Sequence, residues 1–381
     1  MNYFVVFCFF IHTNLFSQSL LDKEPLLVGS VRVLEEDVPI YKKINREISK
    51  FIKEKDSFIF NDKDPRNRDK LFRFPFKDYY KLETFYGEDF VVTPNLVSLY
   101  PVEKNYYIAK IMWAFHLENE GTYLHMINNF LVYYDKDNFR LQNITSYNLK
   151  NWKRKKVGNI MYLFEKDFFF NHDKADEMLN FHKNISLFFE HTPFDFTYVV
   201  CKNTNHMYNT LGYDFHTDMY GSDTSTGSAY VEDALIFSGN NSEIYRHELI
   251  HLHINKKFGF VNNFLEEGLA TFLGGSREIA YEAHLSKLKK YFESKPNSVF
   301  FEICFEGNLD KNTSMPYITA AFICETVYED CGKEQLFEML NVVGKDNTKK
   351  NLKDYLKSIY EVNTDSDLNQ LLVNKIINKN D

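Results

Sequence analysis

Long hydrophobic runs and concentrated charge are both scarce in this chain of 381 residues. Beyond residue 19, no stretch approaches the roughly 18 uninterrupted apolar residues of a membrane-spanning helix, so we expect no integral membrane segment in the mature chain. Lysine and arginine total 45 against 53 acidic residues, which gives a net charge of −8. The one dense basic cluster, at residues 153–156, is typical of a solvated turn. Because a basic stripe is lacking, we expect no nucleic-acid binding.

Cysteine is also rare, with five residues in the chain. None has C-x-x-C spacing, which argues against a cysteine zinc site. Outside the N-terminal segment only four remain, too few for a disulfide scaffold: Cys201, Cys304, Cys324 and Cys331. We expect buried free thiols or one bridge, with no catalytic role.

The N-terminal residues 1–19 have the pattern of a secretory signal peptide. An apolar core at residues 4–11 precedes Ser17-Gln18-Ser19, where small residues two apart match a signal-peptidase site. The segment has no lysine or arginine before its core, and a buried N-terminal strand is the alternative. The signal-peptide interpretation predicts export to the periplasm or the extracellular space.

Apolar and aromatic residues are plentiful, at 44% and 17% of the chain, and the length suits two domains. We expect an N-terminal domain at residues 20–172. Between residues 90 and 170, runs rich in Val, Ile, Tyr and Phe alternate with polar breaks, which is typical of antiparallel strands. Four such strands are expected, at residues 106–116, 122–134, 139–147 and 157–164. An amphipathic helix is expected before them, at residues 40–55. We therefore expect an α+β protein whose N-terminal domain is mainly β.

From residue 173 to residue 381 the pattern becomes mostly helical. A helix at residues 173–189 precedes two short strands, at 196–201 and 230–237. After residue 275 further helices are expected, at residues 276–293, 314–330, 333–340, 348–360 and 366–377. The second domain should thus combine a small sheet with a helical C-terminal lobe.

The main chemical signal is the motif H-E-L-I-H at residues 247–251. On a helix, His247 and His251 stand about 40° apart and roughly 6 Å along the axis, so both imidazoles project from one face. Such a pair binds Zn²⁺, and Glu248 is placed to act as general base on a metal-bound water. His253 is turned about 240° from His247 and should not bind the same ion. The alternative is a solvated amphipathic helix with two surface histidines.

A catalytic zinc needs a third protein ligand, for which Glu267 is the best candidate. Ser242 is the expected N-cap of the first helix, and Gly259 is the expected C-terminal stop. Asn263 and Glu266 form a capping-box pattern at the start of a second helix, which carries Glu267 in its first turn. This spacing fits a helix hairpin that returns Glu267 towards the two histidines.

Together, H-E-L-I-H at 247–251 and E-G-L-A at 267–270 resemble the gluzincin metallopeptidases. Their second-helix motif is typically N-E-G-x-A, and Glu266 stands where the Asn usually does. Residues 317–322 and Gly332 resemble the helix that follows the zinc site in peptidase MA-like domains, so the resemblance covers about residues 175–381. Only fifteen residues separate the second histidine from Glu267, and no G-x-M-E-N exopeptidase motif is present. Endopeptidase and exopeptidase action both stay open.

The resemblance implies a gluzincin-like catalytic domain, with a small sheet, a zinc helix hairpin and a helical lobe. It also implies that Tyr317 assists catalysis by stabilising the oxyanion, with Tyr230 as the second candidate and a packed core tyrosine as the alternative role for both. The strand at 230–237 would be the sheet edge that pairs with an extended peptide. Position 271, where thermolysin-like proteins carry an acid, is Thr271 here.

We therefore predict a zinc-dependent metallopeptidase that acts on a peptide or protein substrate. Zn²⁺ would be held by His247, His251 and Glu267, and it would activate a water whose proton Glu248 accepts as general base. Two alternatives are an exported binding or assembly protein with an inactive peptidase-like domain and a zinc hydrolase of another kind. Since loss of function usually erases the base, the intact Glu248 argues against the first alternative.

Overall fold

The computed structural model describes residues 38–54, 92–117, 121–136, 138–219, 226–305, 307–346 and 349–379. The expected signal peptide at residues 1–19 lies outside these described residues. The fold is α+β, as expected, with strands concentrated in the first part of the chain and helices in the last. Among the described residues, no helix is both long and apolar enough to cross a membrane.

The chain divides into two compact units. The N-terminal unit comprises Met1–Lys150 and Tyr208–Gly221, and the C-terminal unit comprises Asn151–Met207 and Ser222–Asp381. The sequence predicted a single domain boundary after residue 172. The strands at Lys153–Val157 and Ile160–Phe164 belong to the C-terminal unit because the second of them pairs with a strand of that unit.

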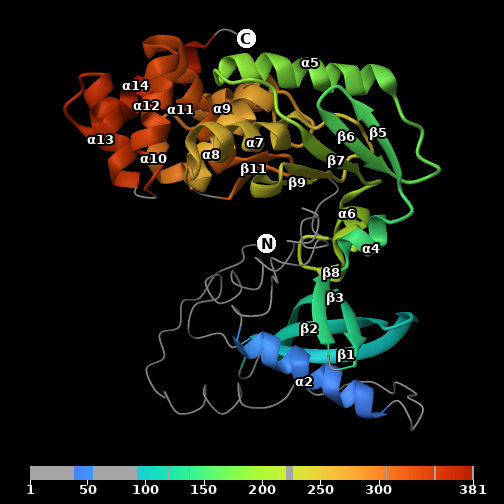
Figure 1. Ribbon diagram of the computed structural model, residues 1–381. Coiled ribbons are helices and arrows are strands. Elements are labelled where there is room, and N and C mark those ends of the chain that lie inside the picture. Colours follow the sequence, from blue (N-terminus) through green and yellow to red (C-terminus); the bar gives the residue numbers. More distant parts are fainter. Residues whose placement is uncertain are drawn as a thin grey trace. The chain divides into compact units, whose positions relative to one another are not determined.

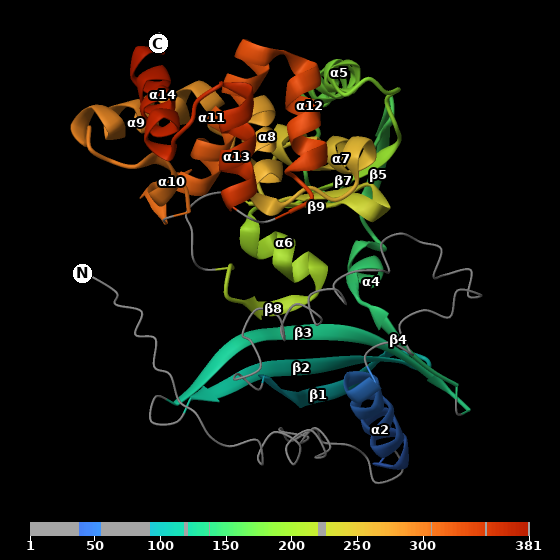
Figure 2. The same cartoon turned by 90° about the vertical axis from the view of Figure 1, so that its left-hand side faces the viewer.

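The N-terminal unit is built on an antiparallel sheet in the order β1-β2-β3-β4, with β8 paired to β3. Its strands are β1 (Val92–Glu103), β2 (Tyr106–Leu117), β3 (Gly121–Asp135), β4 (Asn138–Asn143) and β8 (Tyr213–His216). The helices are α2 (Val38–Glu54) and α4 (Thr145–Leu149). In Figures 1 and 2, α2 lies along this sheet. The strand pattern in the sequence thus predicted most of this sheet.

The C-terminal unit contains a mixed sheet in the order β5-β6-β7-β10-β9. Its strands are β5 (Lys153–Val157), β6 (Ile160–Phe164), β7 (Phe196–Val200), β9 (Gly227–Tyr230) and β10 (Leu235–Ser238). Strands β6, β7 and β10 run parallel, while β5 and β9 are antiparallel edges. The basic residues 153–156 therefore form an edge strand, and the turn expected there is wrong.

The single strand expected at residues 230–237 is also wrong. Strand β9 ends at Tyr230, the 3₁₀ turn η4 (Val231–Asp233) follows, and β10 begins at Leu235. Ala234 adopts a left-handed conformation with φ of 47°, which reverses the chain so that β10 pairs antiparallel with β9. As a result β10 is an interior strand, and β9 is the edge strand on this side of the sheet.

Two helices cover one face of this sheet, namely α5 (His172–Phe188) and α7 (Arg246–Phe258). Leu249 and Leu252 of α7 pack there against Tyr162 and Tyr198 of the strands. The two tyrosine hydroxyls donate hydrogen bonds to backbone carbonyls at residues 242 and 243, which anchors the segment that leads into α7. The sheet thereby sets where α7 begins.

The remaining helices of the C-terminal unit gather at one end of its sheet (Figures 1 and 2). They are α8 (Asn263–Gly274), α9 (Tyr281–Ser294), α10 (Phe300–Ile303), α11 (Met315–Cys331), α12 (Lys333–Val342), α13 (Lys349–Ile359) and α14 (Asp365–Asn378). Helix α6 (Thr204–Leu211) begins in the C-terminal unit, and its residues from Tyr208 onwards belong to the N-terminal unit. A short hairpin, β11 (Asn308–Asp310) with β12 (Thr313–Ser314), precedes α11. Helix α11 is buried on most sides and forms the centre of the lobe.

The four cysteines of the described residues are free thiols. Cys201, Cys304 and Cys324 are buried, and Cys331 is exposed. Burial raises the pKa of Cys304 and of Cys324 to about 12, which keeps both thiols protonated and unreactive. The expectation of buried thiols is confirmed for three of the four.

Candidate metal centre

The first element of the site is helix α7. Its N-cap lies three residues after Ser242, the N-cap predicted from the sequence. Its N-cap is Tyr245, which makes no side-chain capping bond. Ser242 is held instead in the incoming segment, where its carbonyl accepts the Tyr198 hydroxyl bond. The helix ends at the C-cap Gly259, as expected, with φ of 68°.

The second element, α8, begins at Asn263 with Asn262 as its N-cap. The Asn262 carboxamide oxygen accepts the Leu265 N–H at 3.0 Å, so the expected capping box of Asn263 with Glu266 is wrong by one residue. The Asn262 amide also donates to the carbonyls of Val343 and Asp346 at 3.2 and 2.8 Å. This shift leaves the Glu266 carboxylate available for a contact with α7.

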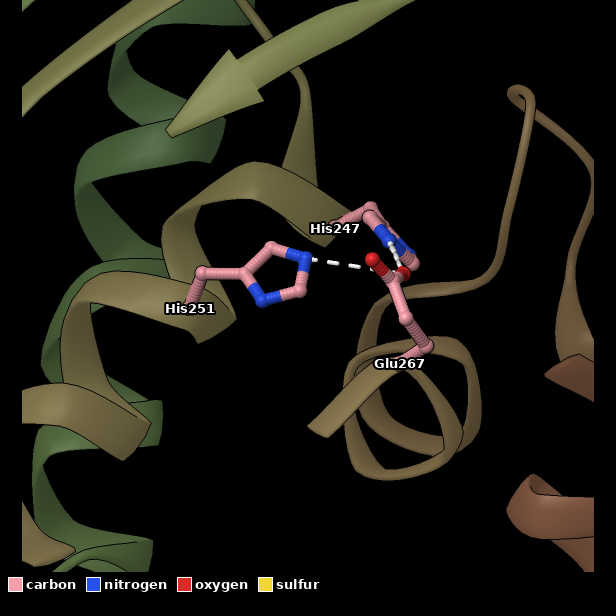
Figure 3. Close-up of side chains that lie close together, drawn as sticks. All are labelled: His247, His251 and Glu267. Atoms are coloured by element: carbon pink, nitrogen blue, oxygen red, sulfur yellow. Dashed lines mark hydrogen bonds and ion pairs between the residues drawn. The ribbon is translucent and has the colours of Figure 1, made fainter. Parts of the chain in front are cut away.

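Helices α7 and α8 bring His247, His251 and Glu267 together, and Figure 3 shows their side chains pointing towards one another. Glu267 Oε2 lies 3.0 Å from His247 Nε2 and 3.7 Å from His251 Nε2. All three ligand atoms lie within 4.8 Å of one another. In a tetrahedral zinc site with bonds of about 2.0–2.1 Å, neighbouring ligand atoms are roughly 3.3–3.4 Å apart. The two distances bracket that separation, so the donor set fits a small divalent metal ion.

Each histidine is oriented through its other ring nitrogen. His247 Nδ1 donates to the carbonyl oxygen of Gly275 at 2.7 Å. His251 Nδ1 donates to Glu266 Oε1 at 3.0 Å. Because each Nδ1 donates to an acceptor, Nε2 is in each ring the nitrogen that faces Glu267 and is left to bind a metal ion. Neither orienting group was predicted from the sequence, although Glu266 directly precedes the candidate ligand Glu267.

The charges of these residues reinforce one another. Burial alone would lower the pKa of His251, but Glu267, Glu266 and Glu248 raise it to about 9. Burial would likewise raise the pKa of Glu267, and its interactions with His251, His247 and Tyr317 bring it below its ordinary value. Metal-free His251 is therefore an imidazolium paired with carboxylates, and a dication would replace its Nε2 proton.

Glu248 lies beside the cluster and is buried. Burial raises the pKa of its carboxyl group, while His251 and His247 oppose that rise. The backbone N–H of Ala229 in β9 donates a hydrogen bond to it. A Cβ atom at Gly227 would lie 2.6 Å from Glu248 Cγ and 2.4 Å from a Tyr245 ring carbon, so the close approach of β9 requires glycine there. Glu248 is thus held by the edge strand next to the ligand atoms.

The structure places Tyr317 at the site. Its ring stacks on His247 with centroids 6.1 Å apart and an interplanar angle of 6°. Its hydroxyl forms a hydrogen bond with the Glu267 carboxylate. Tyr230, the second candidate, lies in β9 with its ring against Phe237 at 5.8 Å. Of the two tyrosines, Tyr317 contacts the cluster directly.

His253 faces away from the cluster, as its position on the helix predicts. Its Nε2 lies 3.0 Å from His182 Nδ1, and its Nδ1 lies 3.2 Å from His191 Nε2. His182 is fully buried. Thr271 is buried, and its hydroxyl makes no hydrogen bond to the described residues. The Gly275 carbonyl orients His247 instead.

Comparison of the chain with protein-family models, with curated proteins and with solved structures gave no match.

Proposed function

We propose that this protein is a zinc-dependent metallopeptidase with His247, His251 and Glu267 as metal ligands. The observation that carries the proposal is the convergence of two Nε2 atoms and one carboxylate oxygen within 4.8 Å. Two histidines and one glutamate match the ligand set of catalytic zinc in peptidases, which keeps a fourth position open. The fold proposed for the C-terminal unit is gluzincin-like.

A zinc ion bound by these residues would supply an acidified water and a Lewis acid for the peptide carbonyl. Glu248 is the proposed general base, because its carboxylate adjoins the ligands and burial raises its pKa above the ordinary value of a glutamate. After accepting a proton it would return that proton to the leaving amine. The Glu267 side chain is 17% exposed and that of His251 is 10% exposed, so the buried centre touches solvent. Substrate would approach from that side.

The pattern of residues 1–19 supports a further part of the proposal, namely export to the periplasm or the extracellular space. N-terminal sequencing of the mature protein tests it directly. A mature chain that begins at or near residue 20 would support export, whereas a retained N-terminus would contradict it.

The experiment that tests the peptidase proposal is digestion of a peptide library by the purified chain with zinc, followed by mass spectrometry. Three variants accompany the wild type: Glu248→Gln, His251→Ala and, as a matched control, Glu282→Gln at an exposed position of α9. General bases contribute about 10²–10⁴-fold to rate, so Glu248→Gln should lose at least that factor while retaining zinc. Wild type and Glu282→Gln should cleave equally, and His251→Ala should lose both zinc and cleavage.

The positions of the cuts will distinguish endopeptidase from exopeptidase action. Stoichiometric zinc without cleavage of any peptide would favour a zinc hydrolase of another kind or an inactive peptidase-like domain. A wild-type chain that binds no zinc would overturn the proposal altogether.

A further inference from the structure

His251 is contacted at both ring nitrogens by consecutive residues of one helix. Its Nε2 lies 3.7 Å from the Glu267 carboxylate, and its Nδ1 lies 3.0 Å from the Glu266 carboxylate. Successive residues on a helix are about 100° apart, so Glu266 and Glu267 can reach round opposite edges of a single imidazole. The start of α8 therefore fixes the rotation of the His251 ring as well as providing a ligand.

The other histidine is oriented differently. His247 Nδ1 donates to a neutral backbone carbonyl, that of Gly275. His251 Nδ1 donates to an anionic side chain, that of Glu266. The gluzincin motif usually has the neutral amide of Asn at the position of Glu266. This chain thus keeps an acceptor at that place and adds a negative charge.

The extra charge lies close to where a dication would bind. A dication at the three ligand atoms would meet one negative charge on Glu267, and Glu266 would provide another beyond the imidazole. A carboxylate that accepts from the free N–H of a ligand histidine raises the basicity of that ligand and holds its ring in place. The Glu266 side chain is 25% exposed, and the His251 side chain is 10% exposed, so solvent screens this interaction only in part.

We propose that Glu266 is an anionic residue that positions His251. Both its hydrogen bond to His251 and its negative charge would increase the affinity of the site for the metal ion. The inference rests on the metal centre of the proposed function and is independent of the reaction carried out there. Glu266 itself touches neither the metal position nor a reacting atom; it acts through His251.

The test separates charge from hydrogen bonding. Glu266→Gln keeps the shape and the acceptor oxygen but removes the charge, and Glu266→Ala removes both. Zinc affinity is measured by competition with a chromophoric chelator on the full chain, with Glu282→Gln as the control for loss of an exposed carboxylate. Changes in residues that orient metal ligands typically cost about 10–100-fold in affinity. We expect about a tenfold loss in Glu266→Gln, a loss nearer 100-fold in Glu266→Ala, and none in the control.

A second readout follows the geometry of the site. Cobalt(II) replaces zinc, and its visible absorption reports the arrangement of the ligands. Glu266→Gln should retain the wild-type spectrum because the ring stays oriented, whereas Glu266→Ala should change it. Circular dichroism of the metal-free variants verifies folding. Should Glu266→Ala misfold, Glu266→Gln carries the test.

Equal zinc affinities of wild type and Glu266→Gln would overturn the role of the charge. Equal zinc affinities of wild type and Glu266→Ala would show that Glu266 contacts His251 without contributing to metal binding, and would overturn the proposal. Absence of peptide cleavage with the expected order of affinities would leave the inference supported while the peptidase proposal failed. Absence of zinc in the wild type would overturn both.

Discussion

The Nδ1 atom of His247 lies 2.7 Å from the carbonyl oxygen of Gly275. This contact joins the first turn of α7 to the residue that ends α8, so the C-terminus of one helix orients a side chain of the other. It depends on the backbone of Gly275, which has φ of 74° and ψ of −170°, a conformation essentially confined to glycine. The orientation of His247 is therefore set by a residue with no side chain.

Replacing Gly275 should disturb both stability and metal binding. A Cβ atom there would lie 2.4 Å from the Ile279 carbonyl oxygen, and the residue would occupy a disfavoured backbone region. We expect Gly275→Ala to lower the free energy of unfolding by about 1–3 kcal/mol and to weaken zinc binding. Gly259→Ala is the matched control: its φ is 68°, and nothing lies within 4 Å of its Cβ position. Chemical denaturation and chelator competition measure both effects. An equal loss of zinc affinity in the two variants would contradict a specific role for the Gly275 carbonyl.

The Tyr317 hydroxyl should act on Glu267, the proposed metal ligand that it contacts. Tyr317→Phe keeps the stacking on His247 and removes the hydrogen bond to Glu267, so we expect about a tenfold or greater loss of zinc affinity. Tyr281→Phe is the control, since its hydroxyl donates to the Glu325 carboxylate at 2.7 Å. That change should cost about 1–3 kcal/mol of stability and leave zinc affinity unchanged. If Tyr317→Phe instead loses turnover with full zinc affinity, the oxyanion role predicted from the sequence is the better one.

Gly268 permits the close packing of α8 on α11. A Cβ atom at this position would lie 2.5 Å from Ala320 Cβ and 2.6 Å from its carbonyl carbon. We expect Gly268→Ala to lower the free energy of unfolding by about 1–3 kcal/mol, although alanine favours a helix, because overpacking displaces the helix. Adding Ala320→Gly should restore stability only in part, since the backbone contact remains. Denaturation curves that coincide with the wild type would argue against this packing constraint.

The buried histidine His182 should make stability depend on pH. Burial lowers its pKa from the ordinary value of 6.5, despite the opposing hydrogen bond to the Phe194 carbonyl. Below about pH 6.5 the unfolded chain takes up a proton that the folded chain excludes, so stability should fall as pH decreases. One such group contributes at most about 1.4 kcal/mol per pH unit.

Denaturation between about pH 5 and pH 8 measures this slope. His182→Gln should reduce the slope relative to wild type, whatever its effect on stability at neutral pH. His172→Gln, at the exposed start of the same helix, controls for the removal of a histidine. A His182→Gln slope identical to that of the wild type would show that His182 does not exclude the proton.

Local patterns in the sequence carried much of the information about the site. The four-residue spacing of His247 and His251 placed both on one face of a helix, because helical geometry depends only on neighbouring residues. Gly259 marked the end of α7 for the same reason, since a positive φ suits glycine whatever surrounds it. Three of the five strands of the N-terminal sheet, β2, β3 and β4, were also readable, because their apolar residues and polar breaks lie within each segment.

Contacts between distant segments decided the rest. Ser242 failed as a cap because strand tyrosines from β6 and β7 bind the carbonyls of its segment. The edge strand proved to be β9, since a single left-handed residue, Ala234, reversed the chain. Both the support of His251 by Glu266 and that of His247 by Gly275 depend on how α8 packs against α7.

The sequence by itself indicated which residues form the candidate metal centre, because the types of donor atom and their helical spacing are local properties. Only the tertiary structure decided how the side chains that carry those donor atoms are oriented. Orientation is set by hydrogen bonds and by close backbone approaches between elements, and no periodicity within one segment encodes the partner that another segment will provide.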